Sequence, residues 1–186
     1  LVLLASRLGP IELTPPTHQD YPTVLETIGH LEAIPAGGTS TIDPLHRSQG
    51  LSPLNFERIR QAKPGGSWHD WDERLRAKCH LKDSGSTYTA VYSRMRWEAP
   101  APTITTQFYA FGTGRFGHPE QNRALSLREG ALLQTFPQNY AFVAPWAINQ
   151  ISMGQVGAQI GNAVPINLAK AIGQSIHSHL TAHNVL

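Results

Sequence analysis

Apolar residues recur at helical spacing in two short segments near the start of the chain. Residues 21–31 and 54–62 place them three and four positions apart, so each segment predicts a short helix. Thr23 stands as the cap of the first helix, with Glu26 at its third position. Pro64-Gly65-Gly66 stops the second helix.

Two further helices are predicted in the last third of the chain. Ser126-Leu-Arg-Glu129 is a capping box, in which hydroxyl and carboxylate each accept a backbone N–H, and the helix it begins runs to about Thr135. From Ala163 onward apolar residues recur at every fourth position, with Pro165 tolerated in the first turn. This terminal helix needs a large apolar partner surface.

Other stretches favour strand and loop. Leu1 to Ser6 is a short apolar run typical of a strand buried on both faces of a parallel sheet. Residues 87–92 and 103–108 are rich in Thr and aromatic residues and are predicted as strands, whereas residues 33–53 are predicted as loop. We therefore expect an α+β fold, with a small mixed region of strands and loops and few helices.

Composition narrows the class of protein. The 186 residues are 40% hydrophobic, which is enough for a conventional core, and 16 Gly with 14 Pro indicate many turns. The single cysteine, Cys79, excludes a disulfide framework and the zinc sites that need two or four cysteines within this chain. We expect a cytoplasmic protein with no membrane partner and no metal. The absence of an initiator Met suggests that the sequence is a piece of a longer protein.

Basic charge is concentrated in the middle of the chain. Residues 1–45 carry a net charge of −4, from one Arg against five carboxylates, while residues 46–96 carry +5, from ten Lys and Arg against five carboxylates. Arg supplies eleven of the fifteen cations, and its planar fork suits phosphate and guanine edges. A solvated basic face and a nucleic-acid surface explain this charge equally well.

Three motifs that could hold a nucleotide, a metal or a nucleophile are weak in context. Gly112-Thr-Gly-Arg-Phe-Gly117 matches a dinucleotide loop, but His118-Pro119 follows where a helix should open, so a glycine-rich loop between strands is favoured. His177, His179 and His183 lack an acidic or thiol ligand nearby. Cys79 lies between Lys78 and His80 without a positioning motif for catalysis.

Gln159-Ile-Gly-Asn-Ala-Val-Pro165 carries more information. A Gly-Asn pair just before a long amphipathic helix provides a tight turn, and the amide of Asn162 can cap the helix or hold a polar ligand. On physical grounds alone, a cap is favoured.

Three stretches taken together resemble the C-terminal part of the bacterial DNA (cytosine-5)-methyltransferases of restriction–modification systems. Residues 123–137 are similar to the ninth conserved block of that family, and residues 159–165 with the following helix are similar to the tenth. Tyr92-Ser-Arg-Met-Arg-Trp97, followed by Pro102-Thr-Ile-Thr105, resembles the end of the target-recognition region. The order and spacing of the three stretches agree with the family.

The resemblance implies a reaction that this chain could complete only in part. In the family, the target cytosine is flipped out of the duplex, a Cys thiolate attacks C6, and S-adenosylmethionine donates its methyl group to C5. The chain has no Pro-Cys dipeptide, no Glu-Asn-Val and no Phe-x-Gly-x-Gly cofactor loop. The resemblance therefore implies no catalytic residue here and a chain that is inactive by itself.

The resemblance also implies a domain division and a set of contacts. Residues 1–20 and 146–186 would belong to an absent α/β, Rossmann-like catalytic domain, and residues 21–145 would form the target-recognition domain. Asn162, with the backbone of Ala163, would close one side of the S-adenosylmethionine pocket. Arg128 and Glu129 would be structural. The implied contacts to double-stranded DNA are Arg94 and Arg96 to bases or backbone, Thr103 to a phosphate next to the flipped base, Thr105 beside it in the sequence, and Arg47, Arg58, Arg60 and Lys63 to phosphates.

Three alternatives remain for the role of this chain. It could be the recognition portion of a single-chain enzyme, or a naturally separate, non-catalytic subunit, because split methyltransferases of this family place the last blocks on their own polypeptide. In both cases its partner would be the missing catalytic domain or subunit. It could also be a stand-alone basic module that binds DNA without sequence preference.

Overall fold

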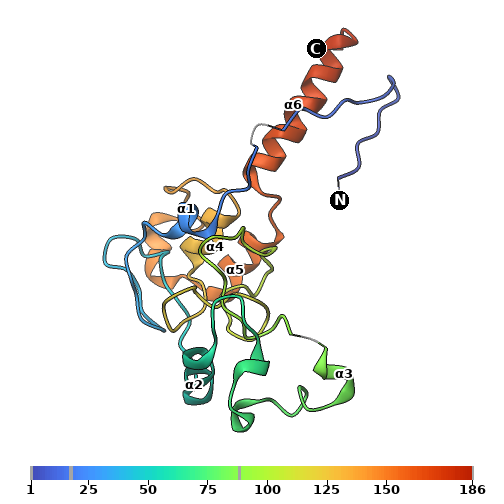
Figure 1. Ribbon diagram of the computed structural model, residues 1–186. Helices are drawn as coiled ribbons and strands as arrows, with labels where there is room; N and C mark the ends of the chain where they lie inside the picture. Colours follow the sequence, from blue (N-terminus) through green and yellow to red (C-terminus); the bar gives the residue numbers. More distant parts are fainter. Residues whose placement is uncertain (1, 17–18, 88, 186) are drawn as a thin grey trace. The chain divides into compact units, whose positions relative to one another are not determined.

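The computed structural model describes residues 2–16, 19–87 and 89–185 (Figure 1). It divides the chain into two compact units, which are described separately. The larger unit is Pro22–Ala163, and the smaller combines Leu1–Tyr21 with Val164–Leu186. Residues 146–163 therefore pack with the segment that precedes them.

Helices dominate the regular structure. The α-helices are α1 (Val24–Ile28), α2 (Pro53–Gln61), α3 (Asp83–Ser86), α4 (Leu127–Leu133), α5 (Met153–Asn162) and α6 (Ile166–Ala182), and the short 3₁₀ helices are η1 (Trp68–Asp70), η2 (Glu73–Leu75) and η3 (Pro145–Gln150). The four helices predicted from the sequence, α1, α2, α4 and α6, are confirmed. α5 was not predicted.

Both predicted capping boxes are present. The Ser126 hydroxyl accepts the Glu129 N–H at 3.0 Å, and the Glu129 carboxylate accepts the Ser126 N–H at 2.7 Å. Thr23 and Glu26 repeat the arrangement at the start of α1. Each box satisfies two backbone donors that a helix N-terminus leaves without intrahelical partners, which is why these helices begin where they do.

The predicted α+β class is wrong. Within the described residues, strand pairing is limited to the isolated bridges 39–47, 64–94, 94–117 and 117–124. Pro100 and Pro102 lack the N–H that a ladder requires, and the Phe108 N–H donates to the Thr105 carbonyl at 3.2 Å, which bends residues 105–108 into a turn. The described residues of the predicted strand 87–92 likewise form turns and bends.

Two predictions at the ends of the chain also need correction. Leu1 lies outside the described residues, and residues 2–6 of the predicted strand have no strand partner there. Gly161 and Asn162 are the last two residues of α5, so they form no turn, and the N-cap of α6 is Pro165, with no side-chain cap. The helix predicted from Ala163 onward begins at Ile166, so the i+4 pattern lies in α6 except for Val164, which precedes it.

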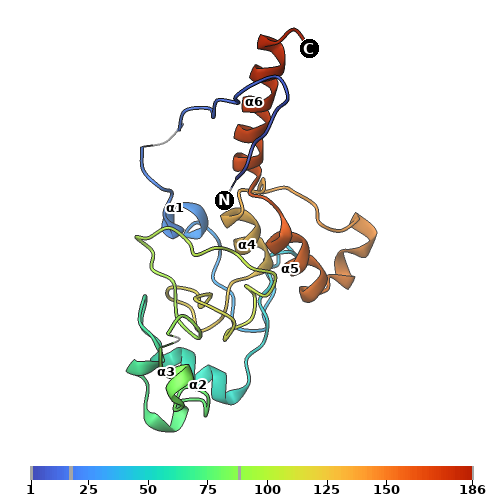
Figure 2. The same cartoon turned by 90° about the vertical axis from the view of Figure 1, so that its right-hand side faces the viewer.

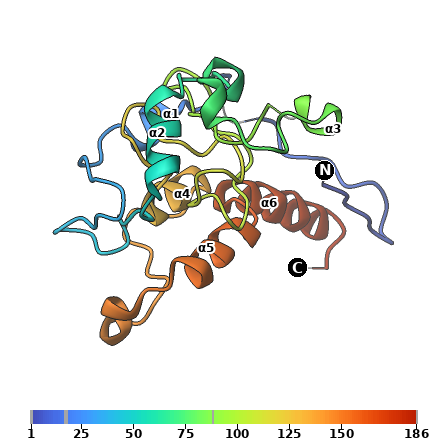
Figure 3. The same ribbon diagram turned by 90° about the horizontal axis from the view of Figure 1, so that it is seen from below.

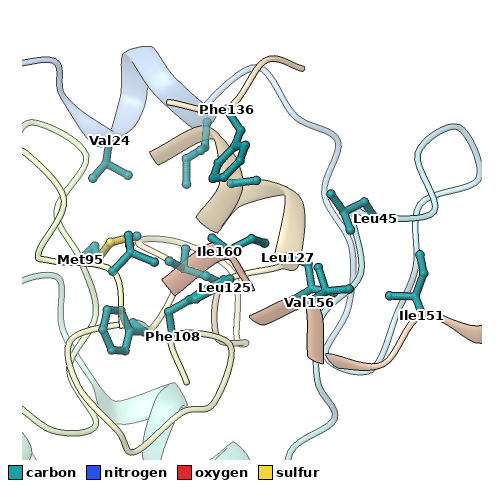
Figure 4. Close-up of a cluster of buried hydrophobic side chains, with 14 residues drawn as sticks. Val24, Leu45, Met95, Phe108, Leu125, Leu127, Phe136, Ile151, Val156 and Ile160 are labelled. Carbon is teal, nitrogen blue, oxygen red and sulfur yellow. The ribbon is translucent and has the colours of Figure 1, made fainter. Parts of the chain in front are cut away.

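The main core of the larger unit lies around α1, α4 and α5. Figure 4 shows its side chains converging from these helices and from the segments between them. α4 and α5 lie side by side in both Figure 1 and Figure 2. The fully buried members include Val24, Phe108, Leu125, Leu127 and Ile160.

Three glycines let the two central helices approach the segment 105–109 closely. A Cβ at Gly130 of α4 would overlap the Phe108 ring, and one at Gly157 of α5 would overlap the Tyr109 ring. A Cβ at Gly161 would overlap the backbone at residues 105 and 106, which cannot move aside as a side-chain end can. The segment 105–109 thus packs directly against α5.

A second buried cluster supports the basic middle of the chain. Trp68, Trp71 and Leu75 of the 67–76 region pack with Ile59 of α2 and with Phe111. The Trp68 ring stacks on His80 at 4.3 Å between centroids. Burial, together with the nearby Arg58 and His69, lowers the pKa of His80. This cluster anchors a region that has little regular secondary structure.

The smaller unit is held by polar contacts between its two segments. The Thr14 N–H donates to the Ser175 hydroxyl at 2.9 Å, and His179 hydrogen-bonds Ser6 at 2.8 Å. Among the described residues of this unit, no hydrophobic side chain is buried, although α6 carries an apolar stripe. Figure 3 shows α6 as one continuous helix, and in the larger unit it shows the chain extending outward after α4 before it returns to α5.

Candidate nucleic-acid interface

A cleft of about 700 Å³ opens on the larger unit. It gathers four residues predicted as DNA contacts from two separate stretches of sequence, Arg94 and Arg96 from one and Thr103 and Thr105 from the other. The lining contains no carboxylate, so the potential in the cleft is positive. The remaining lining residues are Gly65, Ala90, Met95, Ala99, Pro100, Pro102, Thr113, Gly114, Arg115 and Phe116.

Arg94 is buried in the wall of the cleft, where it links α2 with the 118–122 turn. Its side chain is only 5% exposed, and its guanidinium donates to the carbonyls of Ile59 and Ala62 beneath α2, each at 2.8 Å. It also donates to the carbonyls of His118 and Gln121 and to the Asn122 side chain. Burial lowers its pKa. All three guanidinium nitrogens are therefore engaged internally, and none is left for a base or phosphate in this conformation.

Arg96 lies two positions further on and is exposed at the cleft. Its guanidinium packs on Gly65, which has φ of +69° and leaves no room for a Cβ beside Arg96 Nε. The Gly65 N–H donates to the Arg94 carbonyl at 3.0 Å, which fixes the glycine against the same segment. The backbone of Gly65 is thus the surface that orients the Arg96 side chain.

Arg115 is a cleft residue that the sequence reasoning missed. It is exposed in the loop 112–117, whose glycine pattern predicted a glycine-rich loop between strands and no DNA contact. The arginine also lines an adjoining hollow of about 290 Å³ with Gly65 and Ala90. No local sequence signal marks this arginine, because its loop is brought to the cleft by the bridge between residues 94 and 117.

Thr103 and Thr105 are exposed on either side of the buried Ile104. This alternation directs both threonines to the cleft while Ile104 enters the main core. Behind them, Gly161 of α5 touches the backbone at residue 105. The position of the threonine pair is therefore set by the packing of α5.

The four other predicted cations lie outside the cleft lining. Arg58 is buried, donates from Nε to the Leu75 carbonyl at 2.8 Å and lies over the Trp71 and Tyr92 rings, so it supports the second cluster. Arg47 is half-buried, Arg60 is exposed and pairs with Glu57 at 3.3 Å, and Lys63 is exposed.

A buried ionic network stabilises the start of α4. The Arg123 guanidinium makes two bonds of 2.7 Å to the Glu129 carboxylate, and both side chains are almost fully buried. Burial by itself would raise the pKa of Glu129, but Arg123, His118 and the Ser126 N–H outweigh it and hold that pKa below its ordinary value. His46 extends the network through a 2.8 Å bond to the Ser126 hydroxyl.

His118 is neutral within this network. Burial lowers its pKa to about 4, against the opposing effect of Glu129. Its Nδ1 accepts the N–H groups of Glu120 and Gln121, at 3.1 and 2.9 Å, so the proton resides on Nε2, which faces Glu129 at 3.7 Å. The ring therefore shapes the 118–121 turn whose carbonyls bind Arg94.

Arg128 and Glu129 have the structural roles expected of them. Arg128 donates to the Asp43 carboxylate from Nε and, at 3.2 Å, from a terminal nitrogen. Glu129 binds Arg123, as described above. Together these pairs connect α4 with the loop around residue 43 and with the turn that precedes α4.

The two predicted cofactor residues lie at the end of α5. Asn162 is exposed, and its side chain makes no hydrogen bond within the described chain. The Ala163 N–H donates to the Ile160 carbonyl, and its own carbonyl accepts from the Gln134 side chain at 3.2 Å. A hollow of about 300 Å³ next to Ala163 is lined by Phe136, Tyr140 and Phe142 together with Ala141 and Gln159. Asn162 thus has a free amide for a polar ligand, while the backbone of Ala163 is already committed.

The described residues include no cluster of three or more His, Cys, Asp or Glu side chains that could hold a metal ion. Cys79 is exposed and unpaired. None of the described helices combines the length and apolar character needed to cross a membrane.

Comparison with known proteins identifies relatives of this chain. The model of the family "C-5 cytosine-specific DNA methylase" matches residues 17–178. The chain is 49% identical over 182 residues to Type II methylase M.HgiDII of Herpetosiphon aurantiacus, covering 97% of this chain and 51% of that protein. It is 37% identical over 147 residues to Type II methyltransferase M.Sau96I of Staphylococcus aureus, covering 76% of this chain and 31% of that protein.

A third relative is covered over most of its own length. Over 140 residues the chain is 31% identical to Type II methyltransferase M.AquIB of a Picosynechococcus species, covering 73% of this chain and 88% of that protein. The chain thus spans about half the length of M.HgiDII, a smaller share of M.Sau96I, and most of M.AquIB.

Proposed function

Because this chain belongs to the family of C-5 cytosine-specific DNA methylases, we propose that it supplies the DNA-recognition part of an enzyme that methylates C5 of cytosine in a specific duplex site. The methyl donor would be S-adenosylmethionine, and the setting a restriction–modification system. The observation that carries the proposal is the positive cleft in which Arg96 and the two threonines meet without any carboxylate.

The proposed role of each residue depends on whether its side chain is exposed or already bound by the chain. Arg96 contacts a base edge, because its fork is free and oriented, while Thr103 and Thr105 contact the strand beside the flipped cytosine. Lys63 and Arg60 are exposed and suit phosphates that position the duplex. Arg94 and Arg58 support this surface from behind, because their guanidiniums are engaged by the chain.

The proposed division of labour assigns the chemistry elsewhere. The sequence contains no Pro-Cys dipeptide, so the nucleophile would come from a catalytic part not present in this sequence. Pro22–Ala163 would serve as the recognition unit, and the smaller unit would pack with the catalytic part. When S-adenosylmethionine is bound there, it supplies the methyl group, and Asn162 would contribute one side-chain amide to its pocket.

A naturally separate recognition subunit is the second candidate. It is favoured by one observation, the match to M.AquIB, because this chain covers 88% of that relative. A subunit of this kind would bind DNA together with a partner polypeptide that carries the nucleophile and most of the cofactor pocket.

Methyl transfer and DNA binding test the proposal together. We expect the chain alone to bind duplex DNA and to transfer no label from radioactive S-adenosylmethionine, and we expect transfer once the catalytic polypeptide is added. Transfer by the chain alone would contradict the division of labour. Binding that depends on salt but not on sequence would favour a stand-alone basic module, since phosphate contacts carry no base information.

Two substitutions distinguish the proposed contacts in the active protein. Lys63→Ala should weaken binding evenly across DNA sequences, because a phosphate contact is lost. Asn162→Ala should raise the Michaelis constant for S-adenosylmethionine more than it changes DNA affinity. The reverse result for Asn162 would remove it from the pocket.

A further inference from the structure

We propose that Arg115 is a second base-reading residue, so that Arg96 and Arg115 together read two guanines in the target site. The inference rests on the proposed function and adds to it the base composition of the site and a residue that the resemblance does not assign. Gly65 is the residue that positions Arg96 for this task.

The loop that carries Arg115 is held on both sides of that residue. Phe116 is buried in the main core, and a Cβ at Gly114 would lie about 2.5 Å from its ring, so the loop folds tightly over the phenylalanine. Gly117 forms bridges with Arg94 and with Ala124. In the first bridge its N–H donates to the Ser93 carbonyl at 3.0 Å, and its carbonyl accepts the Met95 N–H at 2.9 Å. The exposed Arg115 therefore projects from an anchored backbone.

The two arginines belong to segments that are bound to each other. Arg94 forms bridges with both Pro64 and Gly117, which brings the segments around Gly65, Arg96 and Arg115 to one cleft in a fixed register. Arg94 and Met95 are buried, so Arg96 is the next side chain free to face outward. Two guanidiniums are thus presented from neighbouring, mutually hydrogen-bonded segments.

Neither guanidinium is neutralised. Among the ion pairs of the described residues, none involves Arg96 or Arg115. Asp70 lines the adjoining hollow, and its carboxylate already accepts the Ser67 N–H at 3.1 Å. Both arginine forks consequently keep their donors for a ligand.

The chemistry of the fork selects guanine among the bases. In the major groove guanine presents two acceptors, O6 and N7, side by side, which match two parallel N–H groups of one arginine. Adenine places a donor beside N7 and cytosine presents a donor, so neither accepts both bonds. Because Gly65 confines Arg96 and the bridged Gly117 confines Arg115, each fork approaches one guanine instead of sampling several phosphates.

Selection from a library of DNA duplexes tests this inference, with the complete enzyme or complex that contains this chain. The probe is a duplex with randomised positions around a central cytosine, and the selected duplex is then measured by titration. We expect the wild type to require at least two guanines. Arg115→Ala should lower discrimination at one of them by roughly 5- to 150-fold, and Arg96→Ala should do the same at the other.

Chemical variants of protein and DNA separate base reading from simple charge. Arg115→Lys keeps the cation but not the fork, so it should bind DNA and still lose discrimination at the same guanine. Replacing that guanine by 7-deazaguanine removes N7, which should weaken the wild type and leave Arg115→Ala unaffected. Arg74→Ala is the matched control, since Arg74 is exposed, lies outside the cleft lining and has no proposed contact with DNA, and it should leave base preference unchanged.

Gly65→Ala tests the positioning role. The added methyl group occupies the space of Arg96 Nε, so discrimination should fall at the guanine assigned to Arg96 and persist at the guanine assigned to Arg115. A structural effect alone would weaken both equally. The inference would be overturned, and the proposed function left standing, if Arg115→Ala and Arg115→Lys kept the wild-type base preference and the wild type bound the 7-deazaguanine duplex as tightly as the guanine duplex. Failure of the wild type to bind any duplex would overturn the proposed function, and the inference with it.

Discussion

The two units of this chain use hydrophobic side chains in opposite ways. Pro22–Ala163 contains two clusters of buried hydrophobic side chains and also buries an ion pair, Arg123–Glu129. In the smaller unit, Leu3, Leu13 and Leu168 are exposed, and the recorded links between its segments are hydrogen bonds such as Thr14 to Ser175.

This contrast indicates where stability originates. Burial of apolar area is the dominant favourable contribution to folding, whereas a hydrogen bond that replaces bonds to water contributes only about 1 kcal/mol. The larger unit therefore carries the conformational stability, and it also carries the cleft. The apolar stripe of α6 suits a surface that lies outside this chain, in agreement with the proposed catalytic part.

The largest effect should come from breaking the buried ion pair. Glu129→Gln leaves the Arg123 guanidinium buried without a counter-charge, so we expect a loss of about 3–5 kcal/mol in the free energy of unfolding. Urea denaturation at pH 7 measures it. Glu12→Gln makes the same chemical change at an exposed position of the smaller unit and should give no measurable change.

A double substitution sharpens this result. Arg123→Met combined with Glu129→Leu removes both charges and should recover much of the lost stability, because an apolar pair of similar volume replaces a buried ion pair at little cost. If Glu129→Gln were as mild as Glu12→Gln, the network would not be buried in solution, and the contrast between the units would fail.

The next effect compares one substitution in two helices. Gly161→Ala in α5 forces a methyl group into the backbone at residues 105 and 106, and we expect a loss of roughly 1–3 kcal/mol. Gly173→Ala in α6 meets nothing within 4 Å, so it should be neutral or stabilising by up to about 1 kcal/mol through helix propensity. Thermal unfolding of both variants measures the difference, and equal effects would contradict the close packing of α5.

These packing relations explain how much could be predicted from the sequence. The capping boxes at Thr23 and Ser126 depend on residues three positions apart, so the helix starts were visible without the fold. The end of α5 could not be predicted in this way. The sequence around Gly161 suggested a turn, whereas Gly161 is a helical glycine that leaves room for the backbone at residues 105 and 106. Long-range contact, and not local propensity, determines its identity.

The candidate site was predictable as a stretch but not residue by residue. Arg94 and Arg96 are both arginines and lie two positions apart in the sequence. Arg94 is buried because α2 and the 118–122 turn pack around its side chain. Arg115 was missed because its loop joins the cleft through the bridge between residues 94 and 117. A contact of this kind has no local sequence signal. The predicted strand 103–108 failed for a different reason, since the Phe108 N–H donates to the Thr105 carbonyl and bends the segment into a turn.

Acidification provides the third test of the comparison. His118 has a pKa of about 4 in the folded chain and near 6.5 when unfolded, so the unfolded state binds more protons between these values and stability falls as the pH is lowered through that window. From pH 7 to pH 5 the loss from this residue should be about 2 kcal/mol. Glu129 adds its own loss only at lower pH, because its pKa lies below the ordinary value.

Urea denaturation of His118→Asn at pH 7 and pH 5 isolates this contribution. The variant should be less stable at pH 7 but should lose less stability on acidification than the wild type. His80 titrates in the same direction and remains in both proteins, so the difference between the two slopes belongs to His118. Identical slopes would mean that His118 is accessible to protons in the folded chain.

The smallest effect is expected in α6, and it bears most directly on the comparison. Leu168→Ala removes a side chain that is exposed in this chain, so the free energy of unfolding should change by less than about 0.5 kcal/mol. Leu127→Ala in α4 makes the identical change at a fully buried position and should cost about 2–5 kcal/mol. If Leu168→Ala were as costly in the chain alone, α6 would have a packed partner within the chain itself. If it became costly only when the catalytic polypeptide is added, the apolar stripe would be the surface that joins recognition to catalysis.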